Sequence, residues 1–201
     1  MTARSAPQVK PLGPRILPGR FVTLEPLQAG HRDELFHAAS PDTFRYFPTP
    51  DFESWYAKAR QGREPRHCFV LRQTRDGAVL GSTSYFDMSE KDGRVEIGST
   101  WYSEKARGTA VNPEAKYLLL ANAFDAGYES VVLRTCSRNA CSRAAILKLG
   151  AKQDGILRAA VWMPPGPARE AYFRDSVFYS ILAEEWPNVR ANLEARLAAF
   201  Q

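Results

Sequence analysis

Three consecutive β-rich segments joined by Asp-Gly turns constrain the fold of this chain more than any other feature. The segments are HCFVLRQT (67–74), AVLGSTSYFDM (78–88) and RVEIGSTWYS (94–103), and RDG and KDG precede the second and third of them. Asp-Gly pairs between such segments are typical of hairpin turns. The sequence therefore predicts a meander of three antiparallel strands.

Helices and strands are predicted on both sides of this meander. Before it come a strand at 20–27, a helix at 31–39 and a helix at 53–62 that Gly62 ends. After it come a helix from Asn112 to near Gly127, strands at 130–136, 156–163 and 175–182, a helix at 139–150, and a C-terminal helix at 184–200 broken near Pro187. This order predicts an α+β fold with a mixed, mostly antiparallel central sheet flanked by helices.

The length of 201 residues is suited to one domain, which we place at 20–201. The segment 1–19 contains four prolines and no apolar core, so we expect a flexible N-terminal arm and not a signal peptide. No apolar segment approaches the roughly 18 residues of a membrane helix, so no membrane partner is expected.

The composition indicates which cellular compartment and which kinds of partner suit this chain. Cys68, Cys136 and Cys141 lack the paired spacing of a zinc site, and three cysteines leave one unmatched, which favours a reducing cytoplasm. The histidines are scattered, so no metal is expected. A formal net charge of +5 favours an anionic partner, but no basic stretch with interleaved aromatic residues supports direct nucleic-acid binding.

The segment RGTAVNPEAKYLLL (107–120) has two interpretations. Asn112 as N-cap, Pro113 in the first turn and Glu114 near the positive end of the helix dipole explain a helix start without any ligand. The residues before Asn112 add consecutive main-chain amides and an arginine, Arg107. Such a concave loop at a helix start suits a phosphate or diphosphate group.

Several motifs in order make the chain resemble a known family. EIG-x-TWY, RGTAVN-x-EAKYLLL, N-x-x-SR-x-AI-x-KLGA and SIL-x-EEW are similar to motifs of the GNAT superfamily of acetyl-CoA-dependent N-acetyltransferases. The nearest branch is the Rim type, named for ribosomal-protein N-terminal acetyltransferases. The resemblance spans roughly residues 20–187. It implies a V-shaped cofactor cleft between the strand at about 93–102 and the strand at about 130–136.

The resemblance assigns the loop to the pyrophosphate of acetyl-CoA. The residues concerned are Arg107, Gly108, Thr109, Ala110, Val111 and Asn112. The family pattern Q/R-x-x-G-x-G/A begins at Arg107, and this chain departs from it at Ala110 and Asn112. A left-handed Ala110 would cost about 1–2 kcal/mol and weaken coenzyme A binding.

The preceding strand carries the pantetheine arm in the family, which implies backbone contacts at Trp101 and Tyr102. Strict alternation would place Glu96, Gly98, Thr100 and Tyr102 on one face and Val95, Ile97, Ser99 and Trp101 on the other. Glu96 is one of the few charges within a strand. It has two interpretations, a cross-strand ion pair with a Lys or Arg, or the general base of catalysis.

The helix at 139–150 supplies a second group of candidates. Asn139, Ser142 and Ile146 share one helical face. The family often has a tyrosine where Ile146 stands, to protonate the departing thiolate, and the resemblance implies that Ser142 replaces it while Asn139 holds the cofactor arm. The alternative is that Asn139 is an N-cap and Ser142 has no catalytic role.

The predicted function is transfer of an acetyl group from acetyl-CoA to a primary amine by direct attack in a ternary complex, without a metal. The acceptor is a protein N-terminal α-amine or an amine-bearing small molecule. A non-catalytic CoA-binding module is the alternative function. The sequence does not decide whether the protein forms a homodimer. Trp55, Trp162 and Trp186 are interpreted as packing residues, with Trp55 also a candidate for the acceptor site, and no cysteine is expected to act as a nucleophile.

Overall fold

A computed structural model describes residues 6–61 and 66–200, and within them the chain forms one sheet of seven strands. The strands are β1 (Val22–Pro26), β2 (His67–Gln73), β3 (Val79–Ser89), β4 (Arg94–Tyr102), β5 (Ser130–Cys136), β6 (Lys152–Met163) and β7 (Tyr172–Leu182). The helices are α1 (Arg32–Ala38), α2 (Phe52–Arg60), α3 (Val111–Asp125), α4 (Ala140–Leu149) and α5 (Trp186–Ala198), with short 3-10 turns η1 (Ala29–His31), η2 (Pro41–Phe44) and η3 (Glu104–Ala106). The predicted fold class is confirmed.

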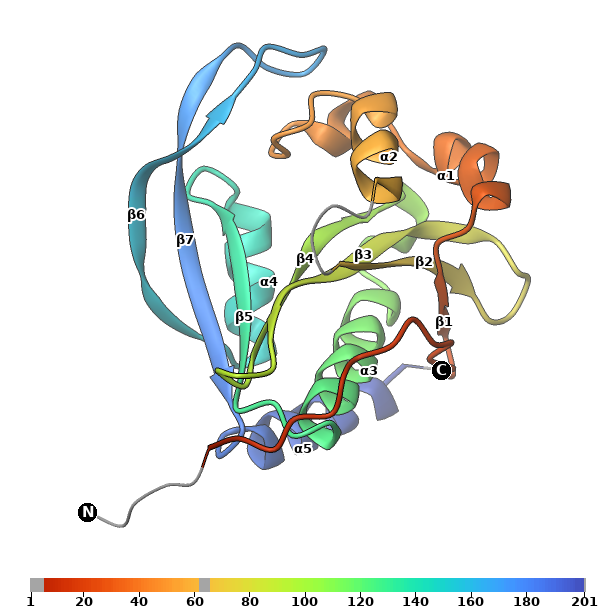
Figure 1. Ribbon diagram of the computed structural model, residues 1–201. Helices are drawn as coiled ribbons and strands as arrows, with labels where there is room; N and C mark the ends of the chain where they lie inside the picture. The colour runs from red at the N-terminus through yellow and green to blue at the C-terminus, as the bar shows by residue number, and fades with distance from the viewer. Residues whose placement is uncertain (1–5, 62–65, 201) are drawn as a thin grey trace.

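The sheet has the order β1-β2-β3-β4-β5-β7-β6, and only the β4–β5 pair is parallel. The predicted meander is the run from β2 to β4. Gly77 and Gly93 end its two turns with φ of 74° and 60°, a region that glycine enters without a steric cost. The β6–β7 hairpin extends beyond the rest of the sheet (Figure 1).

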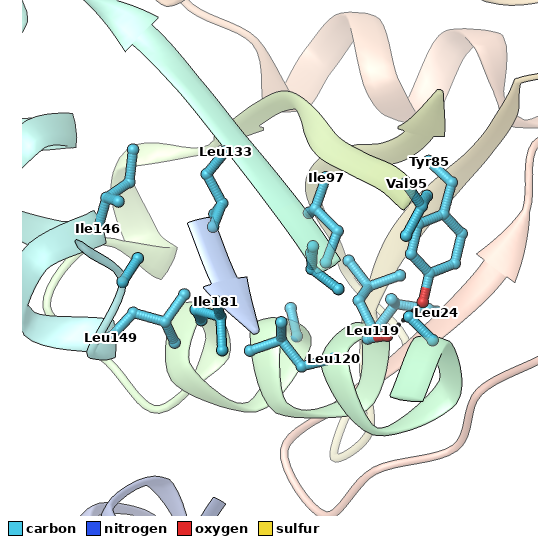
Figure 2. Packing of buried hydrophobic residues seen from close by; sticks show 14 of the residues in the cluster. Leu24, Tyr85, Val95, Ile97, Leu119, Leu120, Leu133, Ile146, Leu149 and Ile181 are labelled. Atoms are coloured by element: carbon cyan, nitrogen blue, oxygen red, sulfur yellow. Dashed lines mark hydrogen bonds between the residues drawn. The ribbon is translucent and has the colours of Figure 1, made fainter. Parts of the chain in front are cut away.

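The main hydrophobic core lies between the sheet and helices α3, α4 and α5. Alternate residues of the strands, such as Ile97 and Leu133, meet Leu119 of α3 and Ile146 of α4 (Figure 2). The Tyr85 hydroxyl donates to the carbonyl of Leu119. A buried tyrosine needs such a partner, so this bond fixes α3 against the meander.

A second, smaller core lies on the other face of the meander, under α1 and α2 (Figure 1). It contains Leu35 of α1, Trp55 of α2, Val70 of β2 and Trp101 of β4. The meander is therefore covered on both faces.

The expected flexible arm differs from the structure. Leu12 and Leu17 are only 5% and 7% exposed and belong to the main core, and Leu17 exchanges two backbone hydrogen bonds of 2.9 Å with Leu24. The described part of the segment therefore packs on the core through these two side chains, because prolines remove backbone donors without preventing apolar side chains from packing. Residues 1–5 lie outside the described ranges, as does Gly62 with its predicted helix stop.

The C-terminal helix is not broken near Pro187. It begins at Trp186, and Pro187 occupies the first turn, where a missing N–H costs nothing. In the part of the chain that the structure describes, no helix is long and apolar enough to cross a membrane.

Candidate active site

The sheet opens where β4 and β5 diverge. These parallel strands pair only through Arg94–Glu96 and Ser130–Val132, and their remaining residues separate. A cleft of about 1120 Å³ occupies this opening, between the start of α3, the start of α4 and the loop that precedes α2. The predicted V-shaped cleft between the two strands is confirmed.

A β-bulge in β4 changes which side chains enter the cleft. Gly98 pairs with Ser84 and Trp101 with Ser82, so Ser99 and Thr100 together oppose one residue of β3, and Ser99 has a φ of 49°. The predicted strict alternation is therefore wrong beyond Gly98.

The bulge reverses the facing of every later residue in β4. Ser99 accepts hydrogen bonds from Trp55 and Arg66, and Trp101 joins the core under α2, whereas Thr100 bonds Thr83 and Lys116 on the α3 side. Glu96, Ser99 and Trp101 thus share the α2 side of the cleft. A serine gives no sequence signal for this conformation, which non-glycine residues seldom adopt.

The loop before α3 presents unpaired main-chain donors. Within the described residues, the amides of Gly108, Thr109, Ala110 and Asn112 have no hydrogen-bond partner. Gly108 has a φ of 77°, and a Cβ placed on it would meet nothing within 4 Å. This open, donor-rich helix start fits a phosphate group, as expected for residues 107–112.

Two expectations about this loop are wrong in detail. The N-cap is Ala110 and not Asn112, because the helix starts at Val111. Ala110 has a φ of −65°, so it carries no left-handed strain and its expected cost does not arise. The side chain of Asn112 instead accepts a hydrogen bond of 2.8 Å from the hydroxyl of Tyr102, which ties the loop to the end of β4. Burial raises the pKa of Tyr102 above its usual range, so this hydroxyl stays a donor.

Glu96 lies where the two strands begin to separate. It is 4% exposed, and its Oε1 is 3.2 Å from Nε of Arg134 on β5. Burial raises its pKa to about 7, an effect that Arg134 opposes and Asp87 reinforces. Glu96 therefore forms the cross-strand ion pair that was one of its two interpretations. Its raised pKa is also the value that a general base needs to work near neutral pH.

The start of α4 forms the opposite wall. Asn139 is the N-cap, and its side chain accepts a hydrogen bond of 3.0 Å from the amide of Ser142. Asn139, Ser142 and Ile146 all line the cleft, together with Trp101, Tyr102 and Arg107. The cleft thus brings together Glu96, Trp101 and Tyr102 of β4 with Arg107, Gly108 and Asn112 of the loop and helix start and with the residues of α4. Of the predicted loop residues, Thr109, Ala110 and Val111 do not line it.

Two buried cations in the cleft escaped the sequence interpretation. Lys116 of α3 is 8% exposed, and its Nζ donates to the Thr100 hydroxyl at 2.9 Å; burial lowers its pKa to about 7. Arg174 of β7 is 7% exposed. The sequence did contain a signal for Lys116, because it is the only charged residue between Glu114 and Asp125 of an otherwise mostly apolar helix.

The remaining candidates separate into structural and surface residues. Trp55 is 2% exposed, bonds Ser99 and lines the cleft, and Trp186 packs in the main core. Trp162 is 52% exposed, and its ring centroid lies 4.9 Å from that of Phe173 with the planes tilted by 60°, so it packs against its neighbour at the surface. Cys136 is buried with its Sγ 3.6 Å from the Tyr172 hydroxyl. Among the described residues, no cluster of three metal-ligating side chains occurs.

Solved structures that resemble this chain include acetyltransferases. A protein of T. thermophilus assigned to the acetyltransferases is 33% identical, with 94% of this chain and 100% of that chain covered and a TM-score of 0.82. A GCN5-related N-acetyltransferase from Brucella melitensis is 26% identical over 97% and 90% of the two chains, with a TM-score of 0.84. Mycobacterium smegmatis RimJ in complex with CoA-disulfide shares the fold at 22% identity, over 96% and 97% of the chains, with a TM-score of 0.69.

The sequence itself matches the family model described as acetyltransferase (GNAT) domain over residues 22–152. The chain therefore belongs to the GNAT acetyltransferases, a family of acyltransferases that use acetyl-CoA. No curated protein matches the sequence significantly.

Proposed function

We propose that this protein transfers the acetyl group of acetyl-CoA to a primary amine, by direct attack while both substrates occupy the cleft. The observation that carries the proposal is Glu96, a buried carboxyl with a pKa of about 7 at the fork of β4 and β5. A carboxylate in that position can accept a proton from an attacking amine near neutral pH.

The donor half of the cleft is proposed to hold coenzyme A by main-chain groups. The free amides of Gly108 and Asn112, which line the cleft, and those of Thr109 and Ala110 between them would bind the diphosphate, with Arg107 beside them. The backbone of Trp101 and Tyr102, in the part of β4 that no longer pairs with β5, would bind the pantetheine arm. Acetyl-CoA supplies the thioester that the amine attacks.

The catalytic roles are divided between two walls of the cleft. Glu96 is proposed to take the proton of the attacking amine, and amides of β4 beyond the bulge to stabilise the developing oxyanion. Ser142 is proposed to protonate the departing thiolate, because Ser142 lines the cleft from α4 and its bond to Asn139 uses only its amide.

The acceptor is proposed to be an α-amine. Such an amine titrates near about 7.7–8.0 and is partly neutral at pH 7, whereas a lysine amine near about 10.4 is almost wholly charged. A base with a pKa of about 7 suits the first of these acceptors. The fold likeness to RimJ supports a protein N-terminus as acceptor, and a small amine is the other candidate.

One pair of measurements tests the proposal. Calorimetry with coenzyme A reports binding, and free-thiol release with acetyl-CoA and a panel of N-terminal peptides and small amines reports transfer, with mass spectrometry to identify the acetylated product. Binding together with an acetylated product supports the proposal. Binding without any product across the panel would favour a non-catalytic CoA-binding module, and no binding would remove the cofactor assignment.

A further inference from the structure

Arg174 is a buried cation that forms no ion pair among the described residues; the charge of Glu96 acts on it, but Glu96 is paired with Arg134. Its Nε and Nη2 donate to the Ser176 hydroxyl at 3.2 and 3.0 Å, and its Nη1 donates to the carbonyl of Tyr46 at 3.2 Å. Both partners are neutral, and in residues 6–61 and 66–200 no carboxylate forms an ion pair with Arg174. Burial lowers the pKa of Arg174, which reflects the cost of desolvating the charge.

Fixing the loop before α2 does not account for this cost. Arg169 already fixes that loop, because its Nη1 donates to the carbonyls of Phe44 at 2.7 Å and Arg45 at 3.1 Å. Arg169 does not line the cleft, whereas Arg174 does. A guanidinium has five N–H groups, and the contacts of Arg174 use three of them. Two donors therefore remain on a side chain that borders the cleft.

The rest of the cleft has the same excess of positive charge. Nine basic and three acidic side chains line it, and two of the acids, Asp42 and Glu96, form ion pairs with Arg45 and Arg134. The phosphates of coenzyme A would account for cations near the start of α3. They do not account for a cation on β7.

Arg66 adds a second guanidinium on the α2 side of the cleft. It lies over β3 and β4, where its Nη2 donates to the hydroxyls of Ser84 and Ser99. Its Nε is buried and has no partner within the described part of the chain. Arg66, which directly precedes β2 and reaches Ser99 of β4, and Arg174 of β7 thus line the same cleft as Glu96, and β5 lies between β4 and β7.

We infer that the acceptor is an amine that also carries a carboxylate, which Arg174 binds through its two remaining donors while Arg66 faces it from the other wall. The inference rests on the proposed function and narrows its acceptor. Arginine is suited to the task because its planar fork matches a carboxylate in a two-bond geometry. Binding of the carboxylate would supply the missing counter-charge of Arg174. The amine of the same acceptor would then be directed toward Glu96.

Matched acceptors test the inference, because each pair differs in one charge and hardly in the basicity of its amine. The first pair is the dipeptide Ala-Gly and its C-terminal amide, and the second is Ser-Glu-Ala amide and Ser-Gln-Ala amide. We expect kcat/KM to favour the carboxylate by roughly tenfold or more in at least one pair. A preference in the first pair identifies a small acceptor, and one in the second identifies an acidic protein N-terminus. Equal rates within both pairs would overturn the inference and leave the acetyltransferase proposal intact.

Arg174→Gln locates the preference, and Arg169→Gln is the matched control. The first substitution should bring the carboxylate and amide rates within about twofold of each other, while the second, which also loosens the loop, should keep the wild-type ratio. Arg174→Lys should retain part of the preference, since it keeps the charge and loses the fork. An unchanged ratio in a folded Arg174→Gln protein contradicts the assignment to Arg174, and if that variant does not fold, the wild-type ratios still decide.

A binding measurement separates this inference from the proposed function. Calorimetry with the N-acetylated dipeptide and its amide, on protein saturated with coenzyme A, requires no turnover. Tighter binding of the free carboxylate without transfer to any acceptor would support the anion site and reject the acetyltransferase reaction. The same measurement is made with N-acetylated Ser-Glu-Ala amide and Ser-Gln-Ala amide. Equal binding within both pairs would reject the anion site.

Discussion

Two ionisable side chains lie on opposite faces of β4, and burial moves the pKa of each to about 7. Glu96 faces the α2 side and pairs with Arg134, whereas Lys116 reaches Thr100 from α3. Each is more than nine-tenths buried, and a structural role alone would favour a less costly residue at either place. Their consequences differ, because one is proposed to act in catalysis and the other affects stability.

Glu96→Gln should remove a limb from the pH–rate profile. In the wild type kcat/KM should fall as pH drops below about 7, because the raised pKa lets Glu96 take up a proton there. The glutamine variant should lack that limb and be slower by roughly 10²-fold or more above about pH 7.5. The acceptor amine titrates in the same way in both experiments, so its contribution to the pH profile is the same for the wild type and the variant. Steady-state rates from about pH 5.5 to 9 give the comparison, with the exposed Glu90→Gln as control, and superimposable profiles would exclude Glu96 as the base.

Lys116→Met should stabilise the protein, and more so at low pH. The folded pKa of about 7 lies below the ordinary value of about 10.4, so the unfolded state binds the proton first as pH falls. The cost of the buried lysine is therefore fully present below about pH 7 and disappears above about pH 10. Urea unfolding at about pH 6 and about pH 9.5 should show a larger gain at the lower pH. The exposed Lys148→Met should change little at either pH, and a pH-independent effect at Lys116 would contradict the expected shift.

At the scale of elements, the bulge in β4 and the start of α3 set the geometry of the cleft. Glu114, in the first turn of α3, accepts hydrogen bonds of 2.8, 2.6 and 2.7 Å from the amides of Arg20, Phe21 and Val22. This buried carboxylate therefore joins α3 to the segment that enters β1. Gly19 fits beside it because a Cβ there would lie 2.8 Å from the Glu114 carboxyl.

Glu114→Ala should destabilise the protein by on the order of 3 kcal/mol, because three amides lose a charged acceptor. Glu114→Gln should cost less, since it retains one acceptor oxygen. Chemical denaturation measures both, and Glu104→Ala, at an exposed position of η3, should change the free energy of unfolding by less than about 0.5 kcal/mol. A loss at Glu114→Ala as small as that at Glu104→Ala would show that this junction contributes little.

The sequence predicted most elements because these follow from local patterns, and the resemblance to the GNAT superfamily implied the cleft. Asp-Gly turns, apolar periodicity and the N-cap at Asn139 act within a few residues of the chain. The bulge could not be predicted, since Ser99 contacts Trp55 of α2 and Arg66 before β2, both more than 30 positions away in the sequence. Glu114 was interpreted through the helix dipole alone, because its true partners lie more than 90 positions away. Asn112 was interpreted as an N-cap, but the helix begins one residue earlier, and its side chain accepts a hydrogen bond from Tyr102.

At the scale of the whole molecule, the N-terminal segment crosses the main core on its way to β1. The amide of Lys10 donates to the carbonyl of Ala126 at 2.8 Å, and Leu12 and Leu17 enter the core beside α3 and β1. The segment thus contacts both ends of α3, since Glu114 binds its last residues. Composition indicated a flexible arm, but two leucines placed against apolar surface are enough to fix it.

Leu17→Ala should cost about 2–4 kcal/mol of unfolding free energy, because it removes buried methyl groups and leaves a cavity. Its neighbour provides the matched control. Ile16 is 60% exposed, so Ile16→Ala should change stability by less than about 0.5 kcal/mol. Thermal or urea unfolding of the two variants gives the comparison, and equal effects would mean that the segment is not packed as described.

The short parallel contact between β4 and β5 has a mechanical consequence. Three residue pairs connect a four-stranded half of the sheet to a three-stranded half, and the cleft begins directly beyond them. Any molecule that contacts both halves at once adds a connection between them at the shortest strand pairing of the sheet. Its binding free energy would then appear as resistance of the entire chain to heat, so thermal shifts offer a search for natural ligands that requires no knowledge of the reaction.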